Sequence, residues 1–409
     1  MRVMFAVSDY LPHYFPMVPL GWALQAAGHE VRVVCAADQV SHVDSAGLTP
    51  VPILEDVDML MWARIGHFWA ARDGRVPADL ELPVVNPRTG EVLDKVEDFD
   101  LDELMKTIRG PEAAKMGRRI DAMVDFAQRW SPDLVVYDLL HLDAVVPAKV
   151  TGVPAVCHLT GPVGTKETEY GLDFIPQHYS RAFDKHGVQE RGTDLISHVV
   201  DICPVSMAPP TDATRLPVRY IPYNGPGSMP AWAARKPRRP RVAVMWSNTL
   251  SHLYGPYTFV VPQIVDALAD LDVEVVLTVN AESAKTLGQL PDNVRLLEHC
   301  PVHLLMATAD VLVHSGGAGA LLTAVAAGVP QLFVTFGAEY RANGRRLAAT
   351  GAGLAVHGPG IDAETIRKSV LTLLEDPSYQ DHAGRLRAEM LDRPSPAQLG
   401  ATLEALTSS

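Results

Sequence analysis

The segment from Val311 to Leu322 constrains the fold of this chain more than any other part of the sequence. Its first residues, Val311 to His314, form a short apolar run typical of a buried parallel strand, and a glycine-dense turn, Ser315 to Gly319, follows. Helical spacing then resumes at Leu321. A strand, turn and helix of this kind leave free N–H groups at the positive end of a helix dipole, where a phosphate can approach the backbone. The turn alone fits anion binding and plain helix–strand packing equally well.

The beginning of the chain predicts a sheet of the same kind. A strand is expected from Arg2 to Val7 and another from Val31 to Ala36, with helical spacing of apolar residues between them. This alternation indicates a parallel sheet covered by helices, in which ligands bind beyond the carboxyl ends of the strands. His13 follows the first strand, and Asp138 ends a strand that begins at Leu134. Each also has a plainer interpretation, as a solvent-facing loop histidine and as a helix cap.

The later segments indicate a second domain of the same architecture. A new alternation of strands and helices begins at Arg241, after a proline-rich segment with the composition of a linker. We therefore expect an N-terminal domain at 1–215, a linker at 216–240, a second domain at 241–385 and a C-terminal helix at 386–409. Within the first domain, a polar, loop-rich insertion is expected from Pro77 to Asp100 and a helix from Arg118 to Trp130.

Composition limits the classes of protein to which the chain can belong. Its 409 residues suit two α/β domains, and 47% hydrophobic with 20% charged residues is typical of a globular protein. A formal net charge of −13 argues against binding to nucleic acid or to an anionic membrane. The four cysteines are far apart and no apolar segment reaches membrane-spanning length, so we expect a cytoplasmic protein.

Three short stretches, the glycine turn and Asn343 carry a resemblance to a known family. His13 to Pro16 with Ala26 to Val31, then His314 to Gly319 with Gly328 to Gln331 and Asn343, resemble the signatures of inverting glycosyltransferases of the GT-B fold. The similarity is greatest to the bacterial antibiotic and macrolide glycosyltransferases. It implies an α/β protein with two Rossmann-like doubly wound domains that face a central cleft, with the last helix packed on the first domain.

The resemblance also implies roles for individual residues. His13 is expected to be the catalytic base and Asp138 its hydrogen-bonding partner. The nucleotide-sugar donor is expected to contact Ser247, Asn248, His299, Val302, His314, Ser315, Gly316, Gly317, Ala318, Gly319, Glu339 and Tyr340.

The donor-binding tract differs from the family pattern at several positions. His299 stands where the family often has tryptophan, Ala320 replaces a hydroxyl residue, and Glu339-Tyr340 replaces an Asp-Gln pair that holds sugar hydroxyls. A deoxysugar has fewer hydroxyls to hold, so the tract is compatible with a dTDP-linked deoxysugar, although a UDP-sugar stays open.

Met59, Trp62 and Phe68 are the expected contacts of the sugar acceptor. They lie in a cluster of methionines and aromatics that corresponds to the variable, acceptor-covering region of the family. An apolar wall of this kind suits a polyketide, macrolide or other hydrophobic aglycone. The same residues also fit an ordinary packed helix.

The mechanism implied is inverting transfer, in which His13 takes a proton from an acceptor hydroxyl. No metal or other cofactor is expected, because neither domain crevice carries an Asp-x-Asp motif and the helix dipole supplies positive potential to the leaving diphosphate. A nucleotide-sugar epimerase of the same fold and a non-catalytic auxiliary protein are the alternatives. A homodimer and a requirement for an activator protein stay open.

Overall fold

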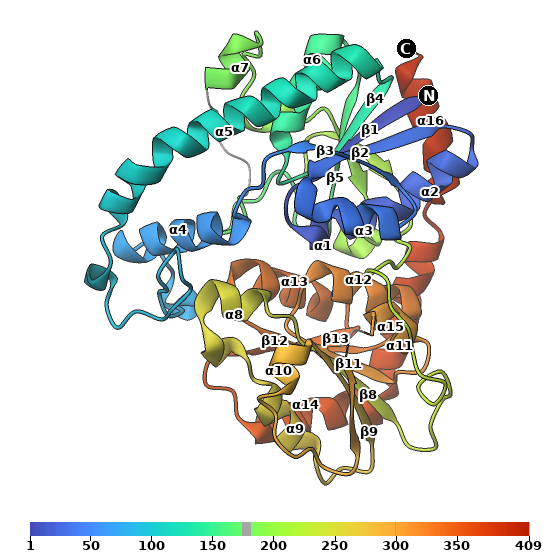
Figure 1. Ribbon diagram of the computed structural model, residues 1–409. Helices are drawn as coiled ribbons and strands as arrows, with labels where there is room; N and C mark the ends of the chain where they lie inside the picture. Colours follow the sequence, from blue (N-terminus) through green and yellow to red (C-terminus); the bar gives the residue numbers. More distant parts are fainter. Residues whose placement is uncertain (174–180, 299, 409) are drawn as a thin grey trace.

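A computed structural model describes residues 1–173, 181–298 and 300–408, and within these ranges the chain forms two parallel sheets (Figure 1). The seven-stranded first sheet has the order β3-β2-β1-β4-β5-β6-β7 in the described part of the chain. Its strands are β1 (Arg2–Ala6), β2 (Glu30–Ala36), β3 (Thr49–Leu54), β4 (Leu134–Asp138), β5 (Ala155–His158), β6 (His198–Asp201) and β7 (Thr214–Pro217). The order reverses between β1 and β4, which opens a crevice beyond their carboxyl ends.

The second sheet repeats this plan, with six parallel strands in the order β10-β9-β8-β11-β12-β13 among the residues described. These strands are β8 (Arg241–Met245), β9 (Glu274–Val279), β10 (Val294–Glu298), β11 (Val311–His314), β12 (Gln331–Thr335) and β13 (Gly353–His357). Here β8 and β11 adjoin at the reversal, so the turns that follow them lie at the second crevice. The predicted α/β architecture with two doubly wound domains is confirmed.

Helices cover both faces of each sheet because the buried strands need apolar cover on both sides. In the first domain they are α1 (Leu11–Tyr14), α2 (Val18–Ala26), α3 (Val40–Ser45), α4 (Met59–Arg72), α5 (Leu101–Trp130), α6 (Val145–Thr151) and α7 (Arg181–Lys185). In the second they are α8 (Thr249–Tyr254), α9 (Val261–Leu268), α10 (Ala281–Ala284), α11 (Val302–Met306), α12 (Ala318–Ala327), α13 (Gly337–Ala349), α14 (Ala363–Glu375) and α15 (Pro377–Leu391). The last helix is α16 (Pro396–Thr407).

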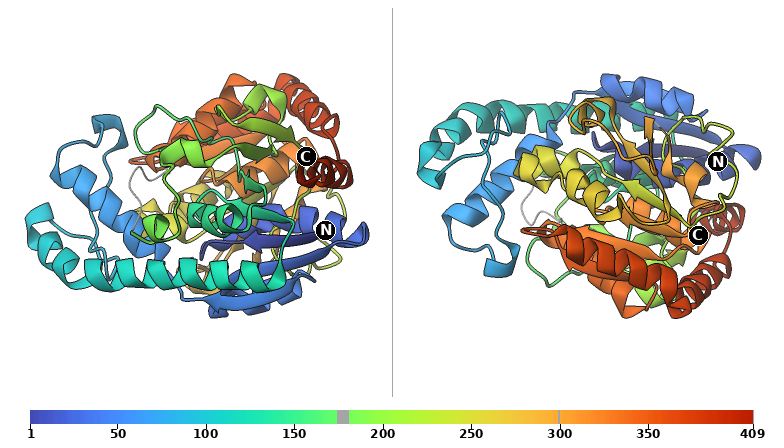
Figure 2. Two further views of the ribbon diagram at one scale, coloured as in Figure 1. Left: turned by 90° about the horizontal axis from the view of Figure 1, so that it is seen from above. Right: turned by 90° about the horizontal axis from the view of Figure 1, so that it is seen from below.

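Helix α4 and the first part of α5 form an arm that projects from the first domain in all views, whereas the second part of α5 packs on the first sheet (Figures 1 and 2). The helix predicted from Arg118 begins at Leu101, because Asp100 caps its first turn and Pro111 is accommodated on an exposed stretch of the helix. The insertion between α4 and α5 is mostly loop, as predicted. Arg64 of α4 donates from Nε to the carbonyl of His252 at 2.6 Å, so the arm contacts the second domain.

The chain returns to the first domain at its end. Helix α16 packs against α2, where Leu399 and Leu403 join the hydrophobic core of the first domain (Figure 1). His29 Nε2 also lies 2.7 Å from a carboxylate oxygen of Glu404. Two boundaries expected from the sequence need correction, because 215 falls inside β7 and 385 falls inside α15. Both elements continue beyond those positions as regular hydrogen-bonded structure.

Candidate active site

The ends of β1 and β4 bring His13 and Asp138 together. His13 lies on the short helix after β1, and its Nδ1 atom is 3.3 Å from Oδ1 of Asp138, the last residue of β4. The backbone N–H groups of Ser8 and Leu140 donate to the two carboxylate oxygens at 2.6 and 2.9 Å. The pair predicted from the sequence is therefore assembled by the topology of the first sheet.

The surroundings of Asp138 favour the ionised form of its carboxyl. Burial raises the pKa of the Asp138 carboxyl, but the hydrogen bond and charge of His13, the charge of His141 and the N–H of Ser8 outweigh burial and hold the pKa below its ordinary value. An ionised carboxylate only accepts hydrogen bonds, so Nδ1 of His13 carries the ring proton in the neutral imidazole. Its Nε2 atom is then left with a lone pair that can accept a proton.

A cavity of about 600 Å³ adjoins His13 and is lined by both domains. One wall is a face of α4 on which Met59, Trp62, Gly66 and Ala70 recur at intervals of three or four residues. Two of the three predicted acceptor contacts, Met59 and Trp62, therefore face the cavity.

Phe68, the third predicted acceptor contact, does not line the cavity, and this part of the prediction is corrected. Its side chain is 1% exposed and belongs to the core between α4 and α5. The ring contacts Phe99 edge-on at 5.8 Å between centroids. Six residues separate Phe68 from Trp62, so helical geometry turns the two side chains to different faces.

The second domain contributes the start of α13 to the same cavity. Glu339 and Tyr340 line it, in the place that the sequence predicted for contacts with the sugar. Burial raises the pKa of Glu339, and the charge of His13, which lines the same cavity, opposes part of that rise. Tyr10 Oη donates to Oγ1 of Thr249 at 3.2 Å, and this bond links the loop of His13 to α8.

The glycine turn after β11 has a different chemistry from the one predicted for His314. The His314 side chain is fully buried, and burial lowers its pKa to about 3. Its Nδ1 accepts from the N–H of Gly316 at 3.2 Å, so Nε2 carries the proton and donates to Oε1 of Gln331 at 3.0 Å. Both ring nitrogens are therefore bonded within the protein, so the predicted contact of His314 with the donor is not supported for its ring.

His314 instead holds the backbone of the turn in place. Gly316 has a φ of +107°, a region that favours glycine, and a Cβ there would lie 2.9 Å from the Phe333 ring. Asn343 donates from Nδ2 to the carbonyl of Gly316 at 3.0 Å, so side chains hold both polar groups of this one residue. The turn ends at Gly317, the N-cap of α12. The first N–H groups of α12 have no partner within the helix.

The turn faces the first domain. A Cβ on Gly161 would lie 2.5 Å from that of Ala318, so the two domains meet closely at the start of α12. Ser315 is buried, whereas Gly317, Ala318 and Gly319 are half-buried.

Other predicted donor contacts lie outside the cavity. Ser247 is exposed after β8, and Asn248 accepts a hydrogen bond from Ser283 Oγ at 2.9 Å. Val302 is buried in the core as the first residue of α11. His299 lies outside the described residues.

The sequence analysis missed the contribution of the linker. Asn224 accepts from the N–H of His303 at 3.2 Å and donates to Oγ1 of Thr323 at 3.2 Å. Thr323 in turn donates to the carbonyl of Gly319 at 2.6 Å, so the linker is tied to the first turns of α12. Asn224 lies in a Tyr-Asn-Gly-Pro sequence that signals a turn, but nothing in that signal shows which helix the turn contacts.

Within the ranges that the structure covers, no group of three or more histidine, cysteine or acidic side chains is arranged to hold a metal ion. None of the helices described is long and apolar enough to cross a membrane.

The two doubly wound domains and the cavity that both of them line define the GT-B class of fold. Residues 22–246 match the N-terminal domain of the family described as erythromycin biosynthesis protein CIII-like, and residues 262–406 match its C-terminal domain. The chain belongs to this family.

Known relatives agree with this assignment over the whole chain. The aklavinone 7-beta-L-rhodosaminyltransferase of Streptomyces galilaeus is 33% identical over 435 residues, covering 100% of this chain and 96% of the relative. The structure of spinosyn forosaminyltransferase SpnP superimposes with a TM-score of 0.77 at 28% identity, covering 100% of both chains. That of glycosyltransferase VinC in complex with dTDP has a TM-score of 0.76 at 27% identity, also over 100% of both chains.

These comparisons confirm the resemblance seen in the sequence, and the protein is a glycosyltransferase. Relatives are named as rhodosaminyl, desosaminyl and mycaminosyl transferases, and the family is named for erythromycin biosynthesis, so transfer to a natural-product aglycone is supported over epimerisation or a purely auxiliary role.

Proposed function

We propose that this enzyme transfers a deoxysugar from a thymidine diphosphate donor to a hydroxyl group of a polyketide aglycone, with inversion at the anomeric carbon. The observation that carries the proposal is the cavity that His13 shares with Trp62 of the first domain and Glu339 of the second. A base, an apolar wall and a sugar-binding carboxylate then surround one reaction centre.

His13 is the proposed general base. Its Nε2 lone pair takes the proton of the acceptor hydroxyl as the oxygen attacks the anomeric carbon, and the C–O bond to the diphosphate breaks. Asp138 accepts the hydrogen bond from Nδ1, which fixes the tautomer and stabilises the imidazolium that forms. Base catalysis of this kind contributes about 10²–10⁴-fold to the rate.

The donor is proposed to lie with its diphosphate at the start of α12. The free N–H groups there and the helix dipole suit a group whose negative charge grows as the bond breaks. The preference for thymidine diphosphate is supported by the VinC complex with dTDP and by deoxysugars in the names of relatives, such as the aclacinomycin-T 2-deoxy-L-fucose transferase. Glu339 is the proposed partner of the sugar hydroxyls.

The acceptor is proposed to lie against α4. Met59, Trp62, Leu82 and Leu253 give the cavity a mainly apolar lining, which suits a flat or macrocyclic polyketide better than a polar acceptor. The aklavinone acceptor in the name of the Streptomyces galilaeus relative is consistent with this class.

Product analysis tests the proposal. The purified enzyme is incubated with dTDP- and UDP-linked sugars, each with and without a panel of aglycones, and the products are identified by mass spectrometry and NMR. A β-linked glycoside from an α-linked dTDP-sugar, formed only with aglycone present, is expected. An isomerised nucleotide sugar without acceptor, or transfer with retention, would contradict the proposal.

A further inference from the structure

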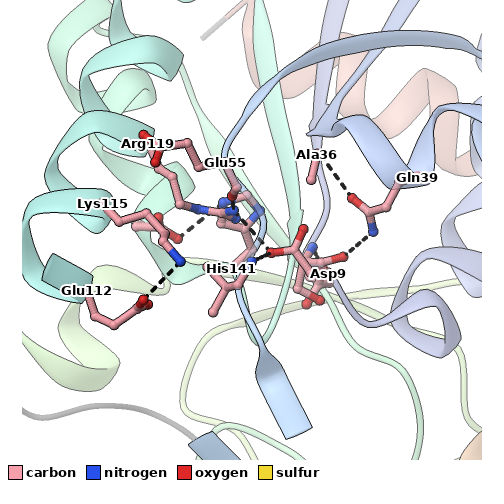
Figure 3. Close-up of polar contacts among 12 residues, drawn as sticks. Asp9, Ala36, Gln39, Glu55, Glu112, Lys115, Arg119 and His141 are labelled. Atoms are coloured by element: carbon pink, nitrogen blue, oxygen red, sulfur yellow. Dashed lines mark hydrogen bonds and ion pairs between the residues drawn. The ribbon is translucent and has the colours of Figure 1, made fainter. Parts of the chain in front are cut away.

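A buried ion pair lies behind the His13–Asp138 pair and outside the cavity. Arg119 of α5 and Asp9 of the β1–α1 loop have side chains that are 3% and 4% exposed, and Nη1 of Arg119 donates to Oδ2 of Asp9 at 3.1 Å (Figure 3). The same carboxylate oxygen accepts from the N–H of Val57 at 2.9 Å. Nη1 of Arg119 also donates to the carbonyl of Glu55. One ion pair therefore joins α5, the β1–α1 loop and the β3–α4 connection.

Two of these three segments carry active-site groups. Asp9 follows Ser8, whose N–H donates to Asp138 and whose carbonyl accepts from Nε2 of Gln39 at 2.7 Å. His13 lies four residues further along the same loop. On the other side, Val57 lies two residues before Met59, the first residue of α4 and part of the apolar wall of the cavity. The ion pair is thus placed to set the distance between the base and the acceptor wall.

The electrostatics of the pair depend on both partners. Burial raises the pKa of Asp9, and the charge of Arg119, the N–H of Val57 and the charge of His141 offset part of that rise. A buried charge that loses its partner is strongly unfavourable, whereas a buried pair replaced as a whole is often tolerated. Loss of Arg119 would therefore raise the pKa of Asp9 further and weaken its carboxyl as the acceptor of the N–H of Val57.

We propose that Asp9 and Arg119 are positioning residues that hold the acceptor wall on α4 in register with the base His13. The inference rests on the proposed role of His13 as base. Neither residue lines the cavity, so neither is expected to contact a substrate. Their effect on catalysis passes through the placement of His13 and α4.

The test compares Asp9→Asn and Arg119→Lys with a buried ion pair elsewhere. Arg241 and Glu274 form a matched control in the second domain, with side chains 1% and 11% exposed and 2.6 Å between Nη2 and Oε2. All variants are measured as kcat and KM per folded molecule, with the folded fraction taken from near-UV circular dichroism. Glu274→Gln is expected to lower Tm and leave kcat unchanged.

We expect Asp9→Asn to lower kcat by about 10–100-fold and to raise the acceptor KM several-fold, with the donor KM changed less than about twofold. Arg119→Lys keeps the charge but loses the planar fork, so it should lower kcat less than Asp9→Asn does. When Asp9→Asn is added to His13→Ala, kcat should fall by less than about twofold further, because residues that act through one group are not additive.

The outcomes separate this inference from the proposed function. If His13→Ala is inactive while Asp9→Asn has the kcat and acceptor KM of the unmodified enzyme, the positioning role is wrong and the base assignment stands. If His13→Ala is fully active, the base assignment itself fails. Should Asp9→Asn not fold, the neutral pair Asp9→Asn with Arg119→Gln removes the unpaired charge and is measured in the same way.

Discussion

The two domains each place a histidine beside the carboxyl end of a central strand, and the two side chains have opposite properties. His13 of the first domain has one ring nitrogen on Asp138 and the other available to the cavity. His314 of the second domain is fully buried between Gly316 and Gln331, with both nitrogens bonded inside the protein. The two sheets thus place a histidine at equivalent positions, and the local contacts determine whether its ring faces the cavity or is bonded within the protein.

The difference originates in the turns that carry the two residues. The His13 side chain is 15% exposed on a short helix that borders the cavity. The turn after His314 is closed over by the Phe333 ring, 4.2 Å from the imidazole between centroids, and by the backbone of Tyr340. Desolvation disfavours the charged imidazolium, so the second histidine remains neutral over the physiological pH range.

The largest expected effect follows from removal of the base. We predict that His13→Ala lowers kcat by about 10²–10⁴-fold with little change in donor affinity, because the imidazole acts only as the acceptor oxygen attacks. Steady-state kinetics with saturating donor measure the loss. His357→Ala is the matched control, since His357 is an exposed histidine outside the cavity. Equal turnover in both variants would remove His13 from the mechanism.

Asp138→Asn is predicted to lower kcat by about 10–10³-fold. The amide cannot replace the carboxylate as a charge partner and can reverse the favoured tautomer of His13. A helix-capping role predicts almost no change, because asparagine caps as well as aspartate. Added to His13→Ala, the substitution should cost almost nothing further in kcat. Additive losses would show that Asp138 does not act through His13.

His158 extends the comparison within the first sheet. It is the register partner of Asp138 on β5, yet it is 1% exposed and its Nδ1 lies 2.9 Å from the carbonyl of Leu159. Burial lowers its pKa to about 4, whereas the hydrogen bond to Leu159 and the charge of Asp138 act in the other direction. His158 therefore cannot act as a base, although it lies beside the same carboxylate, because neither solvent nor substrate can reach it.

This pKa predicts a dependence of stability on pH. In the unfolded chain His158 has a pKa of about 6.5, whereas in the folded protein its pKa is about 4. Between these two pH values the unfolded state binds a proton that the folded state does not, so stability falls as the pH decreases through this window. The contribution is about 1.4 kcal/mol per pH unit, or ~2 kcal/mol by pH 5. The free energy of unfolding, measured by urea titration at several pH values, should change less with pH for His158→Gln than for the unmodified protein. For His357→Gln its change with pH should equal that of the unmodified protein.

Much of the fold and part of the site were predictable from the sequence because they depend on local patterns. Apolar runs, the glycine turn and the place of His13 and Asp138 after strands are local signals, and parallel sheets bring strand ends together by rule. The start of α5 at Leu101 was missed, and the helix accommodates Pro111 on an exposed stretch before the predicted start at Arg118.

The remaining site features depend on contacts between distant residues. The orientation of Phe68 depends on its packing against Phe99, which lies at the far end of the irregular insertion between α4 and α5. The state of His314 is set by Gln331, seventeen residues further along the chain, and the role of Asn224 by a helix almost one hundred residues away. The sequence pattern of one segment does not indicate which distant residues it will contact.

The smallest predicted effect concerns His314 itself. If this residue acts only by holding the glycine turn, His314→Ala should weaken nucleoside diphosphate binding about fivefold, on the order of 1 kcal/mol, the usual net worth of one hydrogen bond. Asn343→Ala should then weaken it by a similar factor, because Asn343 holds the carbonyl of the same Gly316 whose N–H His314 accepts. A direct bond from His314 to the diphosphate predicts a loss of at least about tenfold for His314→Ala and little change for Asn343→Ala, since hydrogen bonds to charged groups are stronger. Titration calorimetry with dTDP on both variants separates the two cases. Equal losses of dTDP affinity in the two variants would indicate that His314 only holds the backbone of the turn, in contrast to His13, which contacts a substrate directly.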